Sequence, residues 1–529
     1  MTAFATTRIE PPLDRWANWV SVFEIENSRL NQLRKAARQR LVDSAQKYLL
    51  QLAAIAEEAG LNENSQEVLT GDPESMPIVM TGHQPVIFHP GLAFKYQITE
   101  RVAADNGAIG IAVSIDTDRG DSGQFSYPRW MTPRSSARHT DGNVDFPISR
   151  EVQTIAKSHN LFAHGRLQSA TDIETIAAEV FQSLNGLGRP ISIHQTADVF
   201  ASYERLAATK CSSAEANTIL RSQHGIGGRL LEIPFSAIAS FPEALTLTAD
   251  ILKQSQRFAK AYNSALKLFR EEHGIRNAAN PFPDLKISGE LCELPFWVVD
   301  HENQVRHVLE VQQDGDVTRL IANEQTIDSF TGSISSDALE PMLLQNIQLV
   351  PRGALITAFL RLLFSDLFVH GVGGARYDQF TDEFIRTWWN CEPPAFTLAT
   401  ASRFAFPDHK SQIERIQSLK TNMRDMQFNP QRHFDQNVFP AELEAKLKSL
   451  SEEKLRVVAQ LKDAKTKGEP AGELGKTIQS ITEQIKAAVA EHFQDDLQLL
   501  DNLIPEQIDT INSRTYPWFF FRPAAVDSL

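Results

Sequence analysis

The first residues that can do chemistry lie in a loop after a short apolar run at residues 77 to 81. Glycine lets the backbone approach a ligand closely, and the amino end of a following helix offers free N–H groups and a positive dipole. Nearby imidazoles and an ammonium group add positive charge, so the combination is typical of an anion or phosphate site. The alternative is a turn whose histidines cap backbone groups. The ligand candidates in this loop are Thr81, Gly82, His83, Gln84, His89, Gly91 and Lys95.

Carboxylates follow the next apolar run at residues 108 to 115, where the sequence continues with Asp116, Thr117 and Asp118. Carboxylates at the end of a strand can hold Mg²⁺, orient a ribose or an amine, or act as a general base. The alternative is a solvated turn. A transition-metal centre made of His83, His89 and Asp116 is a further hypothesis, although this His spacing matches no familiar ligand pattern.

The third candidate is a glycine-rich stretch at residues 370 to 378, which is expected to be a tight loop that enters a helix. An arginine at the start of such a helix can clamp a carboxylate or a phosphate. Its ligand candidates are Gly373, Gly374, Arg376 and Tyr377. Arg361 lies inside a predicted helix and is interpreted as a structural ion-pair partner.

A predicted strand, helix and strand place the first two candidates together. The apolar runs at 77 to 81 and 108 to 115 are typical of buried strands, and a helix is expected between them. In such a unit the two strands are parallel, and ligands bind beyond their carboxyl ends. We therefore expect the stretches near Gly82 and Asp116 to meet on one rim of an α/β fold. The catalytic candidates on this rim are His83, Asp116 and Asp118.

Further predicted elements lie outside this strand, helix and strand. Residues 28 to 58 have the spacing of one long amphipathic helix, and a buried strand at 367 to 370 is expected in the same sheet. Near the carboxyl end, two heptad-patterned arms flank a Gly- and Pro-containing turn at 467 to 472, which predicts an antiparallel coiled coil and self-association as a homodimer. The expected segments are an N-terminal helical segment (1–76), a first half of the core (77–209), an insertion (210–340), a second half of the core (341–408) and a C-terminal helical region (409–529).

Composition limits the classes of partner. The 529 residues carry 52 Lys and Arg against 66 Asp and Glu, a formal net charge of −14. Nucleic acid and anionic membranes demand a basic face, so neither is an expected partner. Three scattered cysteines predict neither a disulfide framework nor a thiol zinc site. The amino terminus lacks a secretory pattern and no long apolar run occurs, which predicts a cytoplasmic protein.

Taken together, the motifs resemble one known family. The Thr-Gly-His-Gln loop at 81, the Asp-Thr-Asp strand end at 116, the Gly-Gly-Ala-Arg-Tyr-Asp stretch at 373 and the final heptad arms are similar to the bacillithiol cysteine-adding enzyme family, BshC. The resemblance implies a Rossmann-like parallel-sheet core of the nucleotidyltransferase and class I synthetase type, with inserts and a coiled-coil dimerisation element. It also implies ligation of cysteine to a glucosaminyl-malate acceptor, with a nucleotide site.

This chain departs from the family at the site itself. His83 stands where the family has Gln, Asp116 where it has Glu, and Thr117 where it has His. We therefore expect a divergent ligase that uses ATP or another nucleotide, with Mg²⁺, to join an amino compound to an amino sugar-type acceptor. Two rival hypotheses are a non-catalytic scaffold that acts through its coiled coil and a metal-dependent hydrolase.

Overall fold

The computed structural model describes residues 6–61, 67–130, 148–157, 159–185, 191–436, 438–502 and 505–522. The fold is mixed α/β, as expected, with both parallel and antiparallel strand pairs. The chain divides into two compact units. The first comprises Met1–Tyr127, Glu151–Arg403 and Arg514–Leu529, and the second comprises Pro128–Arg150 and Phe404–Ser513.

A six-stranded sheet forms the centre of the first unit, and its strand order is β1-β14-β13-β2-β3-β6. The five strands from β14 to β6 are parallel, while β1 runs antiparallel along the edge of β14. The expected strand at 367 to 370 therefore does lie in the same sheet as the strand at 77 to 81. The strands are β1 (Thr6–Glu10), β2 (Ile78–His83), β3 (Ile109–Ser114), β6 (Leu231–Pro234), β13 (Leu367–His370) and β14 (Ala395–Ser402).

Chain order reverses direction at β2. From β2 the chain continues to β3 and β6 on one side of the sheet, and later to β13 and β14 on the other. Connections on the two sides of such a reversal leave opposite faces of the sheet, which opens a crevice at the carboxyl ends of the strands. The switch point of this sheet therefore lies between β2 and β13.

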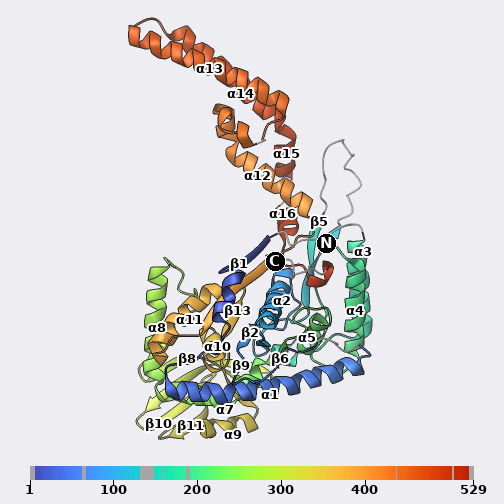
Figure 1. Cartoon of the computed structure of the whole chain (residues 1–529), viewed down its shortest axis with the longest axis vertical. Coiled ribbons are helices and arrows are strands. Elements are labelled where there is room, and N and C mark those ends of the chain that lie inside the picture. Colours follow the sequence, from blue (N-terminus) through green and yellow to red (C-terminus); the bar gives the residue numbers. More distant parts are fainter. Residues whose placement is uncertain are drawn as a thin grey trace. The chain divides into compact units, whose positions relative to one another are not determined.

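Helices cover both faces of the sheet (Figure 1). Alternate residues of β2 point to opposite faces: Ile78 and Met80 pack in one apolar cluster with Leu41, whereas Val79 packs in another with Phe94. The helices of this unit are α1 (Ser28–Glu58), α2 (Pro90–Asp105), α3 (Ala170–Leu184), α4 (Ile193–Ala207), α5 (Ser213–Gln223), α6 (Phe235–Ala239), α7 (Pro242–Lys253), α8 (Ser255–Glu272), α9 (Ser336–Leu344), α10 (Ala354–Leu363) and α11 (Val372–Trp389).

The long helix expected at 28 to 58 is present as α1, the long blue helix of Figure 1. Asn27 caps it by accepting a hydrogen bond from the Leu30 amide, as short polar residues do at helix starts. Its buried Arg34 and Arg38 form ion pairs with Asp366 at 2.6 and 2.7 Å. Since Asp366 immediately precedes β13, these pairs tie α1 to the central sheet.

A second, antiparallel sheet follows the order β11-β10-β9-β8-β12, with the short β7 paired to β8. A turn at Asp314 and Gly315 joins β9 to β10, and Gly315 has the positive φ that the turn requires. The sheet combines strands from the expected insertion with one from the segment after it. The strands are β7 (Ile287–Ser288), β8 (Leu291–Asp300), β9 (Val305–Asp314), β10 (Val317–Ala322), β11 (Gln325–Thr331) and β12 (Ile347–Pro351); β4 (Gln124–Trp130) and β5 (Ile148–Thr154) form a separate pair.

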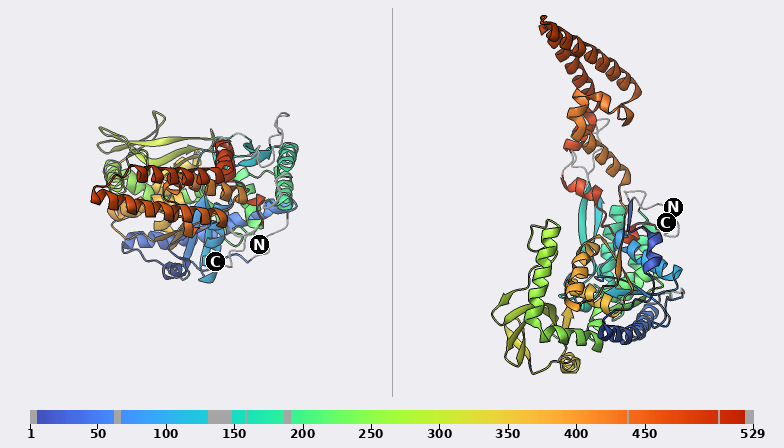
Figure 2. Two further views of the ribbon diagram at one scale, coloured as in Figure 1. Left: turned by 90° about the horizontal axis from the view of Figure 1, so that it is seen from above. Right: turned by 60° about the vertical axis from the view of Figure 1, so that its left-hand side comes forward.

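The second unit is helical. The expected hairpin is present: α13 and α14 run side by side (Figure 2), and their shared core includes Leu447, Val457, Ile481 and Ile485. Gly468 ends α13 in the left-handed conformation, so the turn falls where Gly and Pro predicted it. The helices are α12 (Pro407–Phe428), α13 (Ala441–Lys467), α14 (Gly472–His492), α15 (Gln494–Asn502) and α16 (Pro505–Asn512).

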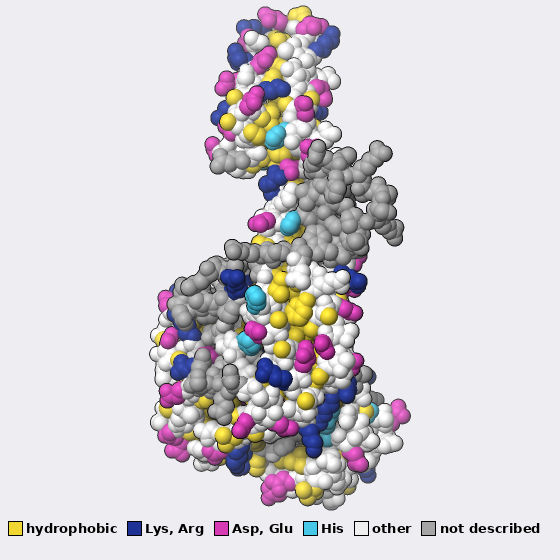
Figure 3. Space-filling model, turned by 90° about the vertical axis from the view of Figure 1, so that its right-hand side faces the viewer, with side chains coloured by type: hydrophobic (Ala, Val, Ile, Leu, Met, Phe, Trp, Pro, Cys, Tyr) yellow, Lys and Arg dark blue, Asp and Glu magenta, His cyan; other side chains and the backbone are white. Residues whose placement is uncertain are grey.

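Three further expectations concern the cysteines, the surface and the helices. Cys211, Cys292 and Cys391 are free and buried, so no disulfide forms among them. On the face drawn in Figure 3, Lys and Arg side chains are interspersed with Asp and Glu. Within the described residues, no helix is both long and apolar enough to cross a membrane.

Candidate functional site

The two loops expected to converge do converge at the carboxyl edge of the parallel sheet. His83 is in register with Ser114, and the Ile115 amide donates to the His83 carbonyl at 2.9 Å. Beyond the strands, Gln84 Nε2 donates to Asp118 Oδ2 at 3.0 Å. The prediction that positions 82 and 116 share one rim is therefore confirmed.

The end of β13 completes this rim on the other side of β2. Thr81 is in register with Val369, and its hydroxyl donates to the Val369 carbonyl at 2.9 Å. Thr81 is fully buried, so it joins the strands and does not face a ligand. Gly82 is packed as well, because a Cβ there would lie 3.2 Å from the Val113 carbonyl oxygen.

Four basic side chains gather around the ends of β2 and β13, and we call them the basic cluster: His83, His89, Lys95 and His370. Lys95 is 2% exposed and donates to the Gly82 carbonyl at 2.7 Å. His370 ends β13 and is buried, while His83 and His89 are half-buried. The cluster combines two strand ends with the first turns of α2.

Hydrogen bonds define which ring nitrogens of the cluster carry a proton. His83 Nδ1 lies 3.1 Å from the Gln84 carbonyl, which can only accept, so Nδ1 donates and Nε2 keeps its lone pair. His89 is the N-cap of α2, and its Nδ1 accepts from the Gly91 amide at 3.1 Å. The proton of a neutral His89 is therefore on Nε2. One ring offers an acceptor and the other offers a donor.

Burial and like charge shift the pKa values of the cluster downwards. Burial, with a smaller contribution from the charge of Lys95, lowers the pKa of His83 to about 3 and that of His89 to about 4. Burial also lowers the pKa of Lys95 to about 7, with the charge of Arg221 acting in the same direction. Arg514, an exposed side chain near the carboxyl end of the chain, adds to the lowering at His89. His83 and His89 are therefore neutral near pH 7 and Lys95 is only partly protonated, and a bound anion would raise all three pKa values.

His370 is held by an acidic partner that the sequence analysis did not select. Its Nε2 lies 2.8 Å from Asp378 Oδ2, and Arg361 Nη1 donates to the same oxygen at 2.9 Å. Burial alone would raise the pKa of Asp378, but the charges of His370 and Arg361 hold it well below its usual value. The interpretation of Arg361 as a structural ion-pair partner is confirmed. The sequence signal that could have selected His370 was its position at the end of a predicted buried strand.

The glycine-rich stretch is not a loop, contrary to the prediction. Helix α11 begins at Val372, so Gly373, Gly374, Arg376 and Tyr377 lie in its first turns. Gly374 packs on His370, because a Cβ there would lie 2.4 Å from Nδ1 of that ring. The other three are not buried, and the ring of Tyr377 lies 5.6 Å from that of Phe282.

Gly91, the remaining glycine candidate, also has a packing role. A Cβ on Gly91 would lie 2.8 Å from the Ala401 carbonyl oxygen and from the Thr400 hydroxyl oxygen. The first turn of α2 therefore packs directly on β14, which only glycine permits at this separation.

The two carboxylates at the end of β3 are already engaged. Asp116 is buried, and its oxygens accept from the amide and the hydroxyl of Ser236 at 2.9 and 2.5 Å. Burial raises the pKa of Asp116. Asp118 accepts from Gln84 and from Arg306 Nη1, the latter at 2.5 Å. Their oxygens hold α6 and β9 in place.

These contacts decide whether the two proposed metal sites can form. Among the residues that the structure describes, no three His, Cys, Asp or Glu side chains are placed to hold a metal ion. The proposed centre of His83, His89 and Asp116 therefore does not form. A Mg²⁺ ion held directly by Asp116 and Asp118 does not fit either, because both carboxylates have protein partners.

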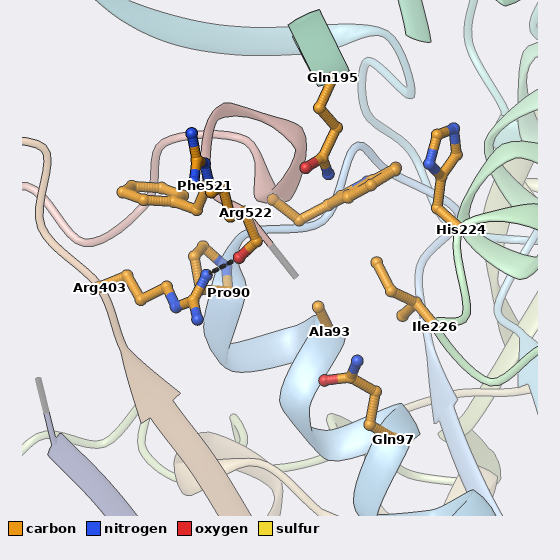
Figure 4. Close-up of a pocket in the computed structure, with 10 residues that line it drawn as sticks. Pro90, Ala93, Gln97, Gln195, His224, Ile226, Arg403, Phe521 and Arg522 are labelled. Atoms are coloured by element: carbon orange, nitrogen blue, oxygen red, sulfur yellow. Dashed lines mark hydrogen bonds between the residues drawn. The ribbon is translucent and has the colours of Figure 1, made fainter. Parts of the chain in front are cut away.

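The carboxyl-terminal tail packs against the first turn of α2, as Figure 4 shows. The Trp518 amide donates to the Phe88 carbonyl at 2.8 Å, and Trp518 and Phe521 are buried. Arg403 donates to the carbonyl of Arg522, the dashed line in Figure 4. The cavity between tail and helix measures about 30 Å³, room for one water rather than a ligand.

No model of a known protein family matches this chain, and no curated protein matches its sequence. The function of the site has to be inferred from its chemistry.

Proposed function

We propose that the first unit is an enzyme that binds a nucleotide at the ends of β2 and β13 and uses it to join an amine to a carboxylate. The reaction class follows the resemblance to the BshC family. The strand order β6-β3-β2-β13-β14 supports it, because Rossmann-type sheets have this order and bind nucleotides at the reversal.

One observation carries the proposal: the basic cluster lies at that reversal. Burying basic groups costs free energy unless an opposite charge accompanies them. Asp378 accompanies His370, whereas His83, His89 and Lys95 have positive neighbours that lower their pKa values further. The phosphates of a nucleotide would place negative charge beside Lys95 and would raise the pKa values of all three groups.

Each group of the cluster then has a role. Nε2–H of His89 and the ammonium of Lys95 would donate to phosphate oxygens, and the amino end of α11, which no side chain caps, would add N–H groups. Nε2 of His83 carries a lone pair that can accept the proton of an attacking amine. ATP, when bound, activates the carboxylate for that attack. A magnesium ion in this scheme is carried by the phosphates and water, since Asp116 and Asp118 are engaged elsewhere.

Calorimetric titration of the full chain with ATP and Mg²⁺ tests the site. We expect Lys95→Met to weaken binding by about tenfold, the effect of losing a charge-assisted hydrogen bond. The variant is expected to stay folded, because methionine fills the same buried volume without a charge. His433→Gln, which changes a buried histidine of the second unit, is the matched control. Absence of ATP binding by the wild-type chain, with and without Mg²⁺, contradicts the proposal.

Turnover tests the reaction class separately. The wild-type chain is incubated with ATP, cysteine and glucosaminyl-malate, and the condensation product is sought by mass spectrometry. Other amines replace cysteine in parallel reactions, since the substitutions at His83, Asp116 and Thr117 lie on the site.

We also propose that α13 and α14 form an antiparallel coiled coil that pairs with a second copy of the chain. Leu455 supports this, because it is 61% exposed and lies outside the heptad positions of α13. We expect Leu455→Glu to shift the chain from dimer to monomer in sedimentation velocity, since a carboxylate cannot be buried there unpaired. Glu453→Gln, at another exposed position of α13, is the control. A wild-type chain that sediments as a monomer at micromolar concentration contradicts the proposal.

A further inference from the structure

A polar cavity of about 350 Å³ lies at the carboxyl ends of β3 and β6. This volume is within the range of small-molecule sites. Its walls come from α1, the start of α5 and the strand ends, and it is lined by Asp116 but by no member of the basic cluster. It is therefore a second candidate site, beside the first along the same edge of the sheet.

The acidic groups of this cavity are satisfied by the protein. Asp116 is held by Ser236, as described above. Glu215 accepts from the amide and hydroxyl of Ser212 in the capping box of α5, and from Gln51 Nε2 at 3.1 Å. Neither carboxylate needs a ligand to complete its hydrogen bonds.

The cationic groups of the cavity have no such partners among the residues that the structure describes. Arg166 and Lys210 both line it and are both exposed. Within the described part of the chain, neither side chain has a hydrogen-bond or ion-pair partner. The same holds for the Tyr48 hydroxyl, which also lines the cavity.

Backbone pairing places the two cations together. Arg166 forms an antiparallel bridge with Ser212, so their side chains share a face. Lys210 precedes Ser212 by two residues and lines the same cavity as Arg166. Two exposed cations thus line the cavity, while the Asp116 that also lines it is buried.

We propose that this cavity binds a small hydroxylated metabolite that carries an oxyanion, either a carboxylate or a phosphate. Arg166 and Lys210 would hold the oxyanion at the mouth, where guanidinium and ammonium groups form charge-assisted hydrogen bonds. Hydroxyl groups of the ligand would reach inward to Tyr48 and to the spare lone pairs of Asp116. The site does not depend on the nucleotide site proposed above.

Three probes of similar size distinguish a carboxylate site from a phosphate site: glycerate, glycerol 3-phosphate and neutral glycerol. Each is titrated against the full chain by ligand-observed NMR at constant ionic strength. We expect one or both anions to bind and glycerol to show no saturable binding. Binding of glycerate alone identifies a carboxylate site, binding of glycerol 3-phosphate alone identifies a phosphate site, and binding of neither overturns the proposal.

Two double variants test whether the anion binds at Arg166 and Lys210. Removing Arg166 and Lys210 together, as Arg166→Ala with Lys210→Ala, is expected to weaken anion binding by at least about tenfold. The matched control, Arg276→Ala with Lys286→Ala, removes two exposed cations elsewhere and is expected to leave binding unchanged. If the control pair weakens anion binding equally, the effect comes from the overall charge of the protein and the proposed site is wrong.

The nucleotide-site variant separates this inference from the proposed function. Lys95→Met is expected to lower ATP binding and to leave the binding of glycerate or glycerol 3-phosphate unchanged. If Lys95→Met abolishes anion binding while the Arg166 and Lys210 pair does not, the anion occupies the basic cluster and the second site is wrong. If ATP does not bind but the anion does, only the proposed function fails.

Discussion

Replacing Asp366 with alanine is expected to destabilise the first unit by about 3–5 kcal/mol, the usual effect of removing one partner of a buried ion pair. Asp366 is 1% exposed and pairs with the buried Arg34 and Arg38 of α1. It also accepts from the amides of Phe23 and Ile78 at 2.8 and 2.6 Å. The substitution leaves two buried guanidinium groups without their counter-ion.

Urea unfolding of the full chain, followed by tryptophan fluorescence, measures this loss. Asp43→Ala is the control, because Asp43 is exposed on the same helix and accepts from Gln39 Nε2 on the helix surface. We expect the control to change the free energy of unfolding by less than about 0.5 kcal/mol. An Asp366→Ala variant as stable as the control would show that α1 does not depend on this ion pair.

Nucleotide binding is expected to weaken by about tenfold between about pH 6 and about pH 8.5. Without ligand, burial holds the pKa of Lys95 at about 7, so its ammonium loses a proton across this range. Phosphate binds the protonated form and raises that pKa, so binding takes up a proton above neutral pH. Affinity is therefore fully present below the unliganded pKa and is lost as pH rises through it.

Calorimetry in two buffers of different ionisation enthalpy measures the proton uptake directly. Lys95→Met has no ammonium at this position, so its weaker binding is expected to vary little over the same range. A wild-type dissociation constant that is equal at the two pH values would mean that Lys95 does not meet the phosphate.

Local patterns predicted several parts of this structure well. The spacing of apolar residues identified α1, and the apolar runs before Gly82 and Asp116 identified β2 and β3. Because a strand, helix and strand usually form a parallel unit, the sequence predicted that the stretches near Gly82 and Asp116 share one rim, and the contact of Gln84 with Asp118 lies on it. The heptad spacing and the Gly468 turn likewise predicted the hairpin of α13 and α14.

Glycine-rich patterns were less reliable. Gly371, Gly373 and Gly374 suggested a loop, yet α11 begins at Val372. The packing of Gly374 against His370 explains the glycine better than a turn does. A glycine required by a neighbouring side chain has the same sequence signal as a glycine required by the backbone.

The amino-acid sequence by itself determined the first two core strands, the rim shared by two loops and the long helices, because each depends on the spacing of nearby residues. Only the tertiary structure decided what the polar groups contact. Asp116 meets Ser236 and Asp118 meets Arg306, pairs separated by 120 and 188 positions. The lowered pKa of Lys95 has the same origin, since burial arises when distant elements pack around a side chain and exclude water.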